Sequence, residues 1–243
     1  MINNYFKHIY CINLDRRKDR WSQVSKEFAE IGILDTVKKF VAIDGSKVNR
    51  NSLNFSLEDH SVKYLSQPLL KILLAKILKN LPKYLFDRMI MSNGEVGCLL
   101  SHIEIIKEAE KKGFENVLIF EDDVVFCDDF NAKLAEFMAN VPSDWDMIYL
   151  GGNHNYHTGN KPEQVNKHVI KCNKTIAIHA IVVKNSIYKH ILDINSLTKP
   201  IDLVYEEIQE NSNVYAPCIS IAKQRAGYSD IRKRQVNYDK WIK

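Results

Sequence analysis

Three acidic side chains directly follow an apolar run, Val117-Leu118-Ile119-Phe120: they are Glu121, Asp122 and Asp123. Because side chains alternate along an extended chain, Glu121 and Asp123 can point to one side and Asp122 to the other. Adjacent carboxylates repel one another and resist burial unless a cation or hydrogen bonds compensate them. The pattern therefore predicts either a ligand site for a cation or an acidic turn where a strand emerges into solvent.

Basic side chains follow another apolar segment near the beginning of the chain. Residues 6–14 are typical of a buried strand, and Arg16, Arg17 and Arg20 come between it and a helix predicted over 21–31. In α/β proteins such a turn presents ligand-binding groups at the carboxyl end of a strand, so the arginines could hold a phosphate. The alternative is a solvated helix start, with the arginines paired to neighbouring aspartates.

Two further stretches carry groups suited to a nucleotide. A second strand, predicted over 39–45, ends in Asp44-Gly45, where an acidic side chain could accept hydrogen bonds from a ribose or a base; the alternative is a simple chain reversal. Gly94 and Gly97 precede a helix predicted to about residue 112, and they allow close backbone approach at its start. His102, on that helix, is by itself more typical of a buried structural histidine.

The elements needed to position these groups alternate along the chain. Strands are predicted over 117–126, 145–152, 175–183 and 214–222, and helices over 129–140, 186–194 and 199–208. Residues 153–166 are expected to form a loop, and a basic tail follows the last strand. Strands that alternate with helices indicate an α/β fold with a mainly parallel sheet flanked by helices, in a single domain over 1–243.

A lysine-rich segment stands apart from this alternation. Leucines and isoleucines recur at helical spacing over 68–85, with lysines between them, which predicts a basic amphipathic helix within an insertion at about 60–90. The helix either packs on the core with its lysines in water or makes a peripheral contact with an anionic membrane.

Composition excludes several classes of protein. The 243 residues are 45% hydrophobic, and 34 basic residues against 30 acidic ones give a net charge of +4, too balanced to indicate nucleic-acid binding. The chain shows neither a signal peptide nor a transmembrane run, and its five dispersed cysteines do not indicate a disulfide framework or a zinc site. We expect a cytoplasmic protein, peripheral to the membrane if the amphipathic helix binds lipid.

Taken in order, these stretches resemble glycosyltransferase family 25, the lipopolysaccharide and collagen β-galactosyltransferase type. The resemblance covers nearly the whole chain and is most specific in the spacing from Gly-Glu-Val-Gly-Cys to Glu-Asp-Asp. The matching residues are Ile12-Asn13-Leu14 with Arg16 and Arg20, Ala42-Ile43-Asp44-Gly45, Gly94-Glu95-Val96-Gly97-Cys98 with Ser101-His102, Phe120-Glu121-Asp122-Asp123, Trp145-Asp146 with Tyr149-Leu150-Gly151, Pro200-Ile201-Asp202 and Ser229-Asp230-Ile231.

The resemblance implies a GT-A (Rossmann-like) fold, a UDP-sugar donor carrying galactose or glucose, Mn²⁺ or Mg²⁺, and inversion at the sugar carbon. It implies a glycan, a lipid-linked sugar or a hydroxylysine-type protein hydroxyl as acceptor. Carboxylates suit those hard cations, so Glu121 and Asp123 are the expected metal ligands. The residues expected around the nucleotide are Asn13, Arg16, Arg20, Asp44, Gly45, Glu95, Ser101, His102 and Asp122.

Inversion also needs a general base for the acceptor hydroxyl, away from the metal carboxylates. Asp202 matches the acidic position of the family's Pro-x-Asp motif, and Glu206 and Glu207, about one turn further on, are the next candidates. The alternative for Asp202 is a helix N-cap, worth about 1 kcal/mol. Two other functions stay open at this point: a nucleotidyltransferase that releases pyrophosphate, and a non-catalytic glycosyltransferase-like binding protein.

Overall fold

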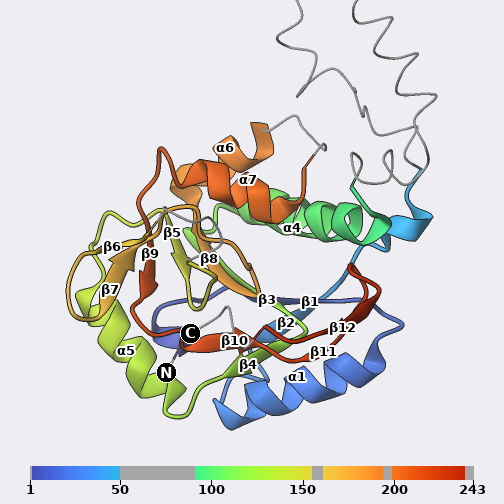
Figure 1. The fold of residues 1–243 in the computed structure, drawn as a ribbon, viewed down its shortest axis with the longest axis horizontal. Helices are drawn as coiled ribbons and strands as arrows, with labels where there is room; N and C mark the ends of the chain where they lie inside the picture. Colours follow the sequence, from blue (N-terminus) through green and yellow to red (C-terminus); the bar gives the residue numbers. More distant parts are fainter. Residues whose placement is uncertain (1, 50–90, 155–160, 194–198, 239–243) are drawn as a thin grey trace, which may run out of the picture.

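A single mixed sheet organises the structure, a computed structural model that describes residues 2–49, 91–154, 161–193 and 199–238 (Figure 1). The predicted lysine-rich insertion and its amphipathic helix lie outside the described residues. In spatial order the strands of the sheet are β2 (Val37–Val41), β1 (Ile9–Asn13), β3 (Asn116–Glu121), β8 (Ala180–Lys184), β5 (Met147–Tyr149), β9 (Val214–Pro217), β7 (Val169–Lys171) and β6 (Glu163–Gln164).

The strand directions agree with the α/β prediction. β1 lies parallel to both β2 and β3, and β5 lies parallel to β9. β8 is antiparallel to both of its neighbours, β3 and β5, and β7 is antiparallel to β9 and β6. Within this sheet only β8 and β7 therefore run against the common direction, and the carboxyl ends of β2, β1 and β3 meet at one edge.

Helices cover both faces of the sheet (Figure 1). One face packs against α4 (Asn93–Lys112), α6 (Tyr188–Asp193) and α7 (Ile201–Ile208), and the other against α1 (Lys18–Glu30) and α5 (Phe130–Asn140). Both faces of a sheet arranged in this way are shielded from water, which is why its strands contain continuous apolar runs.

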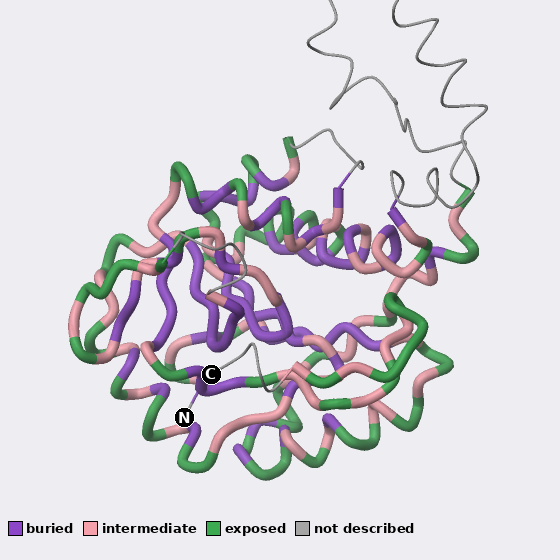
Figure 2. Tube along the Cα trace, in the orientation of Figure 1, coloured by how far each residue is buried: buried purple, intermediate pink, exposed green. Residues whose placement is uncertain are grey.

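Alternation along each strand divides the buried side chains into two cores. Val117 and Ile119 belong to the core beneath α4, whereas Leu118 and Phe120 belong to the core beneath α1 and α5. Figure 2 shows these central strands as almost continuously buried, with exposed residues on the outer surfaces of the helices. A shift of β3 by one residue would exchange the two sets, so the register of this strand is strongly specified.

Several predicted boundaries differ from the structure: the strand expected over 175–183 is β8, which begins at Ala180, and the helix expected to follow Gly94 and Gly97 begins at Asn93, so both glycines lie within α4. The strand expected over 117–126 is interrupted at Asp122-Asp123, and its second half is β4 (Val124–Phe126), which pairs with β10 (Ala222–Gln224) in a separate small sheet. The strand expected over 214–222 correspondingly divides into β9 and β10. The loop expected over 153–166 includes β6, at the far edge of the large sheet.

The basic tail was not predicted to be regular, yet it forms a hairpin, β11 (Gly227–Ser229) with β12 (Arg234–Val236). Among the described residues, the structure contains no helix with the length and apolarity that crossing a membrane requires.

Candidate active site

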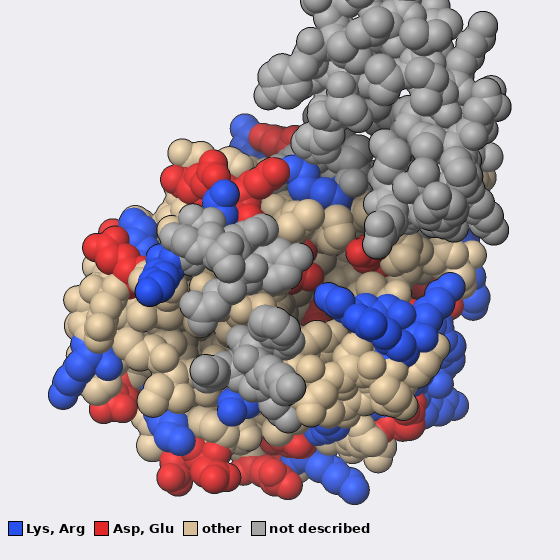
Figure 3. All heavy atoms as spheres, viewed as in Figure 1, with Lys and Arg blue, Asp and Glu red and all other residues tan. Residues whose placement is uncertain are grey.

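A cavity of about 1050 Å³ opens where β1, β2 and β3 end. Its walls are the beginning of α4, the segment 176–178, the beginning of α7 and the hairpin β11–β12. The carboxyl ends of strands are where open α/β sheets place ligands. Figure 3 shows acidic side chains inside a hollow of the surface, with lysine and arginine side chains gathered beside it.

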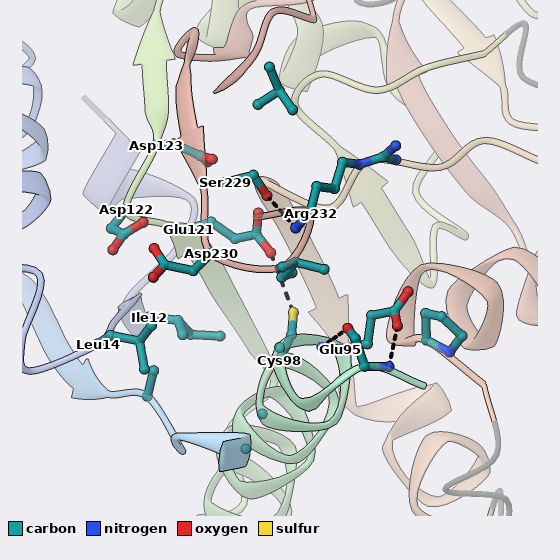
Figure 4. A pocket seen from close by; sticks show the side chains of 18 of the residues that line it. Ile12, Leu14, Glu95, Cys98, Glu121, Asp122, Asp123, Ser229, Asp230 and Arg232 are labelled. Carbon is teal, nitrogen blue, oxygen red and sulfur yellow. Dashed lines mark hydrogen bonds between the residues drawn. The ribbon is translucent and has the colours of Figure 1, made fainter. Parts of the chain in front are cut away.

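Glu121 and Asp123, the predicted metal ligands and here called the carboxylate floor, both line this cavity (Figure 4). Glu121 is the last residue of β3, and Asp123 lies in the turn that leads to β4. Burial, followed by the nearby carboxylates of Asp123 and Asp202, raises the pKa of Glu121 well above its usual value. Cys98 Sγ lies 3.6 Å from Glu121 Oε1, and Gln224 Nε2 lies 3.5 Å from Oε2, so the hydrogen-bond contacts that the described residues make with this carboxylate are long.

Asp122 points to other partners. Its Oδ1 forms an ion pair with Arg20 Nη1 at 2.9 Å, and its Oδ2 accepts a hydrogen bond from Asn13 Nδ2 at 2.6 Å. Burial raises the pKa of Asp122 to about 6, against the opposing effects of Arg20 and Asn13. With both oxygens engaged, Asp122 acts as a support beneath the floor.

Arg20 also reaches the floor itself, because its Nη2 donates to Asp123 Oδ2 at 2.7 Å. The guanidinium that was expected to bind phosphate thus bridges Asp122 and Asp123. Asn13, also expected at the nucleotide, is 1% exposed and lies behind the cavity wall, where it orients Asp122.

The floor fits a hard divalent cation. Asp123 Oδ1 is buried and has no hydrogen-bond partner among the described residues, while Oδ2 of the same carboxylate is held by Arg20. A buried acceptor without a hydrogen-bond partner lowers the stability of the folded protein unless a bound ion, water or ligand interacts with it. Carboxylate oxygens are the ligands that Mg²⁺ and Mn²⁺ prefer, and Glu121 supplies a second carboxylate at the same surface.

Arg16 lies at the rim rather than on the floor. Its Nη1 pairs with Asp44 Oδ2 at 2.7 Å and its Nη2 with Asp230 Oδ1 at 3.0 Å. Arg17 forms an ion pair with the other oxygen of Asp230 and a second one with Asp19. The segment after β1 is therefore tied to the hairpin through Asp230, and Asp44 is oriented toward Arg16.

The beginning of α4 is pressed against the segment that follows β2. A Cβ atom on Gly45 would lie 1.8 Å from the Asn93 carbonyl oxygen, and one on Gly97 would lie 2.4 Å from that of Ile43. Ser101 Oγ accepts a hydrogen bond from the backbone N–H of Ile43 at 2.9 Å. Gly45 and Ser101 thus line the cavity as predicted, and they also hold two of its walls together.

Glu95 lines the cavity as well, but its side chain closes a capping box with Ser92. Glu95 Oε2 accepts from the Ser92 N–H at 2.6 Å, and the Glu95 N–H donates to Ser92 Oγ at 3.2 Å. The helix start is therefore partly satisfied by its own residues, which leaves fewer N–H groups for an anion than the sequence suggested.

His102 is a buried histidine behind the cavity wall, and it does not line the predicted nucleotide side. Its ring lies edge-on to Tyr205, with a centroid distance of 5.8 Å, and burial lowers its pKa to about 3. His102, Cys98 and Glu121 bring potential ligand atoms within 4.8 Å of one another. Burial and the charge of Glu121 raise the pKa of the Cys98 thiol, so the cluster serves first as a hydrogen-bonded support for Glu121.

Asp202 enters the cavity from the first turn of α7. It does not cap the helix: Pro200 is the N-cap residue, and Asp202 Oδ1 instead accepts from the Ala177 N–H at 2.9 Å. Burial raises its pKa above the usual value for aspartate. Of the other two candidate bases, Glu207 pairs with Lys199 at 2.5 Å, and neither Glu206 nor Glu207 is part of the cavity wall.

Sequence reasoning missed two parts of the wall. One is the segment 176–178, where Ala177 adopts a positive φ of 74°, held there by Asp202. The other is the chain from Ser229 to Tyr238, whose first three residues were among the stretches that carry the family resemblance but were not assigned to the site. The three consecutive basic residues at 232–234 were a signal in the sequence, but nothing in the pattern showed that the chain turns back over the carboxylates.

The family model of glycosyltransferase family 25, described as an LPS biosynthesis protein, matches residues 6–198. The chain belongs to glycosyltransferase family 25. This match includes the carboxylate floor and the beginning of α4, and the predicted resemblance is thereby confirmed.

Individual relatives match over a shorter range. Procollagen galactosyltransferase 2 of Homo sapiens is 33% identical over 153 residues, covering 60% of this chain and 21% of that protein. A glycosyltransferase 25 family member of Aedes aegypti is 32% identical and covers 59% and 21%, respectively. Inactive glycosyltransferase 25 family member 3 of Homo sapiens is 32% identical and covers 60% and 22%.

The family-25 chain spans about a fifth of the length of these curated relatives. A crystal structure of a glycosyltransferase involved in glycosylation of the major capsid of PBCV-1 covers 86% of the chain at 10% identity with a TM-score of 0.41, a likeness too low to argue from. Some of these relatives are named galactosyltransferases and others are named inactive. The names of the relatives therefore do not decide whether this chain is active, and the residues of its own cavity are the relevant observation.

Proposed function

We propose that this chain transfers a hexose, galactose or glucose, from a UDP-sugar to a hydroxyl group of a glycan, a lipid-linked sugar or a protein, with inversion at the sugar carbon. The observation that carries the proposal is the bare Asp123 Oδ1 beside Glu121 on the floor of the cavity. A decayed, non-catalytic relative has no need to keep a buried acceptor unpaired.

Glu121 and Asp123 would hold Mn²⁺ or Mg²⁺, which neutralises the charge that develops on the departing diphosphate. Arg20 keeps one oxygen of Asp123 turned away, so that the other remains available. Asp44 and Gly45, at the end of β2, would lie beside the nucleoside, as acidic residues at this position do in nucleotide-binding α/β folds.

Asp202 would act as the general base. The acceptor oxygen forms a bond to the sugar carbon, the bond from that carbon to the diphosphate oxygen breaks, and its electron pair leaves with the diphosphate. The hydroxyl proton passes to Asp202, whose raised pKa makes it a better proton acceptor than an exposed aspartate.

A screen of UDP-sugars tests this function. With purified chain, a pool of glycan acceptors and Mn²⁺, we expect acceptor-dependent release of UDP from UDP-galactose or UDP-glucose, which stops when a chelator removes the ion. Release of pyrophosphate from a nucleoside triphosphate and a sugar phosphate would instead identify a nucleotidyltransferase. Undiminished transfer in chelator would contradict the role given to the floor.

A further inference from the structure

The turn between β11 and β12 carries three consecutive basic residues, Arg232, Lys233 and Arg234, here called the basic turn. All three are exposed and line the same cavity as the carboxylate floor. In Figure 4, Arg232 extends from the hairpin on the opposite side of Glu121 from Asp122. The basic turn belongs to none of the residues that the sequence pattern assigned to the site.

Ion pairs distinguish these cations from the other two in the wall. Arg16 forms ion pairs with Asp44 and Asp230. Arg20 forms ion pairs with Asp122 and Asp123. The basic turn has no ion pair with any other described residue. An anionic ligand could therefore bind these three side chains without first breaking an ion pair between described residues.

The hairpin is held in position before any ligand arrives. Asp230 accepts ion pairs from Arg16 and Arg17 on the segment after β1, and the Arg232 N–H donates to Ser229 Oγ at 3.1 Å. Arg232 thus follows the anchored Asp230 by two residues. A side chain on an anchored turn loses less conformational freedom on binding than one on a free loop.

Arg232 also acts on the interior of the cavity. Its side chain is near enough to Tyr238 to lower the pKa of that hydroxyl, and its charge lowers the pKa of Asp202, in both cases against the larger effect of burial. It is therefore the member of the basic turn whose contacts reach inward, toward both the floor and the proposed base.

A diphosphate is the ligand that these charges fit. It would enter a cavity that already contains the carboxylates of Glu121, Asp123 and Asp202, so neutralisation by a single divalent cation leaves a net repulsion. The Arg232 guanidinium on the hairpin wall offers paired N–H donors to phosphate oxygens.

We infer that Arg232, supported by Lys233 and Arg234, binds the diphosphate of the nucleotide sugar from the hairpin side of the cavity. This inference rests on the proposed function, because it assigns the basic turn to the same donor. It makes Arg232 a donor-binding residue that acts in addition to the metal ligands.

The test compares UDP with uridine, which lacks phosphate, on the full chain in the presence of Mn²⁺. Calorimetry measures the affinity for UDP, and ligand-observed NMR measures the affinity for uridine. We expect Arg232→Gln to lower the affinity for UDP at least about tenfold, the factor that a charge-assisted hydrogen bond accounts for, and to leave the affinity for uridine unchanged. Arg232→Lys should lose only part of the affinity. Lys223→Gln, the same charge change on the exposed face of neighbouring β10 and outside the cavity wall, is the matched control and should bind UDP like the wild type.

Unchanged UDP affinity in Arg232→Gln, or an equal loss for UDP and uridine, would overturn the inference while leaving the proposed donor intact. An equal loss in Lys223→Gln would also overturn it, because net charge would then explain the effect. A wild-type chain that binds no UDP would overturn both the donor and the inference. If Arg232→Gln does not fold, Arg232→Lys decides the question, with a severalfold loss supporting the inference and no loss overturning it.

Discussion

The carboxylate floor and the basic turn face the same cavity, but they are positioned in opposite ways. The floor follows a central strand whose neighbouring residues, Ile119 and Phe120, are fully buried, and its supports are a bridging arginine and an asparagine without solvent access. The basic turn lies on a two-stranded hairpin attached mainly through Asp230. If the proposed function holds, we expect the floor to determine whether transfer occurs and the hairpin to adjust how tightly the donor is bound.

The largest expected effect comes from the floor. Asp123→Asn removes the charge on the bare oxygen, and we expect transfer to fall on the order of a thousandfold, the factor corresponding to several kcal/mol of lost charge stabilisation. UDP release measured over a range of Mn²⁺ concentrations checks this. Asp128→Asn, the same change on the loop before α5 and outside the cavity, should keep full activity; normal turnover in Asp123→Asn would remove the floor from the mechanism.

The next effect concerns Asp202. Asp202→Asn should keep donor affinity and lose at least about a hundredfold in kcat, the lower end of what a positioned base contributes. Because Asp202 also holds Ala177 at positive φ, the matched control is Ala177→Gly, which relieves that backbone strain and should retain most of the rate. If Ala177→Gly loses as much rate as Asp202→Asn, the carboxylate shapes the wall and does not take the proton.

A smaller effect is expected where the hairpin is anchored. Asp230→Asn weakens the pairs with Arg16 and Arg17, and we expect a rise of up to about tenfold in KM for the donor with little change in kcat. Arg16 is half exposed, so its pair contributes only about 0–1 kcal/mol to folding, whereas the Arg17 pair is mostly buried, and the thermal midpoint should fall modestly. A large fall in kcat with unchanged KM would mean that the hairpin belongs to the catalytic machinery after all.

The smallest expected effect concerns His102 and the pH dependence of the unfolding free energy. Burial holds the pKa of His102 at about 3, below its usual 6.5, so between these values the unfolded chain binds the proton and the folded chain does not. Unfolding free energy should therefore fall as pH decreases through this window, and His102→Gln should reduce that dependence. Denaturant titrations at pH 7, 5 and 4 measure it. Parallel pH curves for the two proteins would show that His102 accepts a proton in the folded state.

Much of the fold follows from local patterns. Apolar runs ending in polar groups predicted β1, β2 and β3 and their shared edge, and the run at Ser92–Glu95 has the spacing of the capping box that begins α4. The break at Asp122-Asp123 was predicted only as one of two alternatives, an acidic turn at the strand end, because alternation alone assumes that an extended chain continues. Here the pairing of Asp122 with Arg20 and Asn13 turns the chain instead.

Sequence identified the acidic members of the site better than the basic ones. Carboxylates next to an apolar run are conspicuous in a sequence because burying a charge without a compensating partner is unfavourable. Glu121, Asp123 and Asp202 all line the cavity. Arginines carry no such signal: the same residue type pairs with a rim aspartate at Arg16, bridges two carboxylates at Arg20, and remains without an ion-pair partner among the described residues at Arg232. Only the tertiary arrangement distinguishes these three positions.

The contact between Gly45 and α4 limits how the cavity of this chain could be redesigned. The atoms that a new Cβ would meet are main-chain atoms of Asn93 and Gly97, so no change of rotamer can make room for it. Enlarging or reshaping the nucleoside side of the cavity by substitution at Gly45 or Gly97 would therefore require the helix to move as a whole. A library aimed at a different ligand should leave this pair of glycines fixed and vary other side chains that line the cavity.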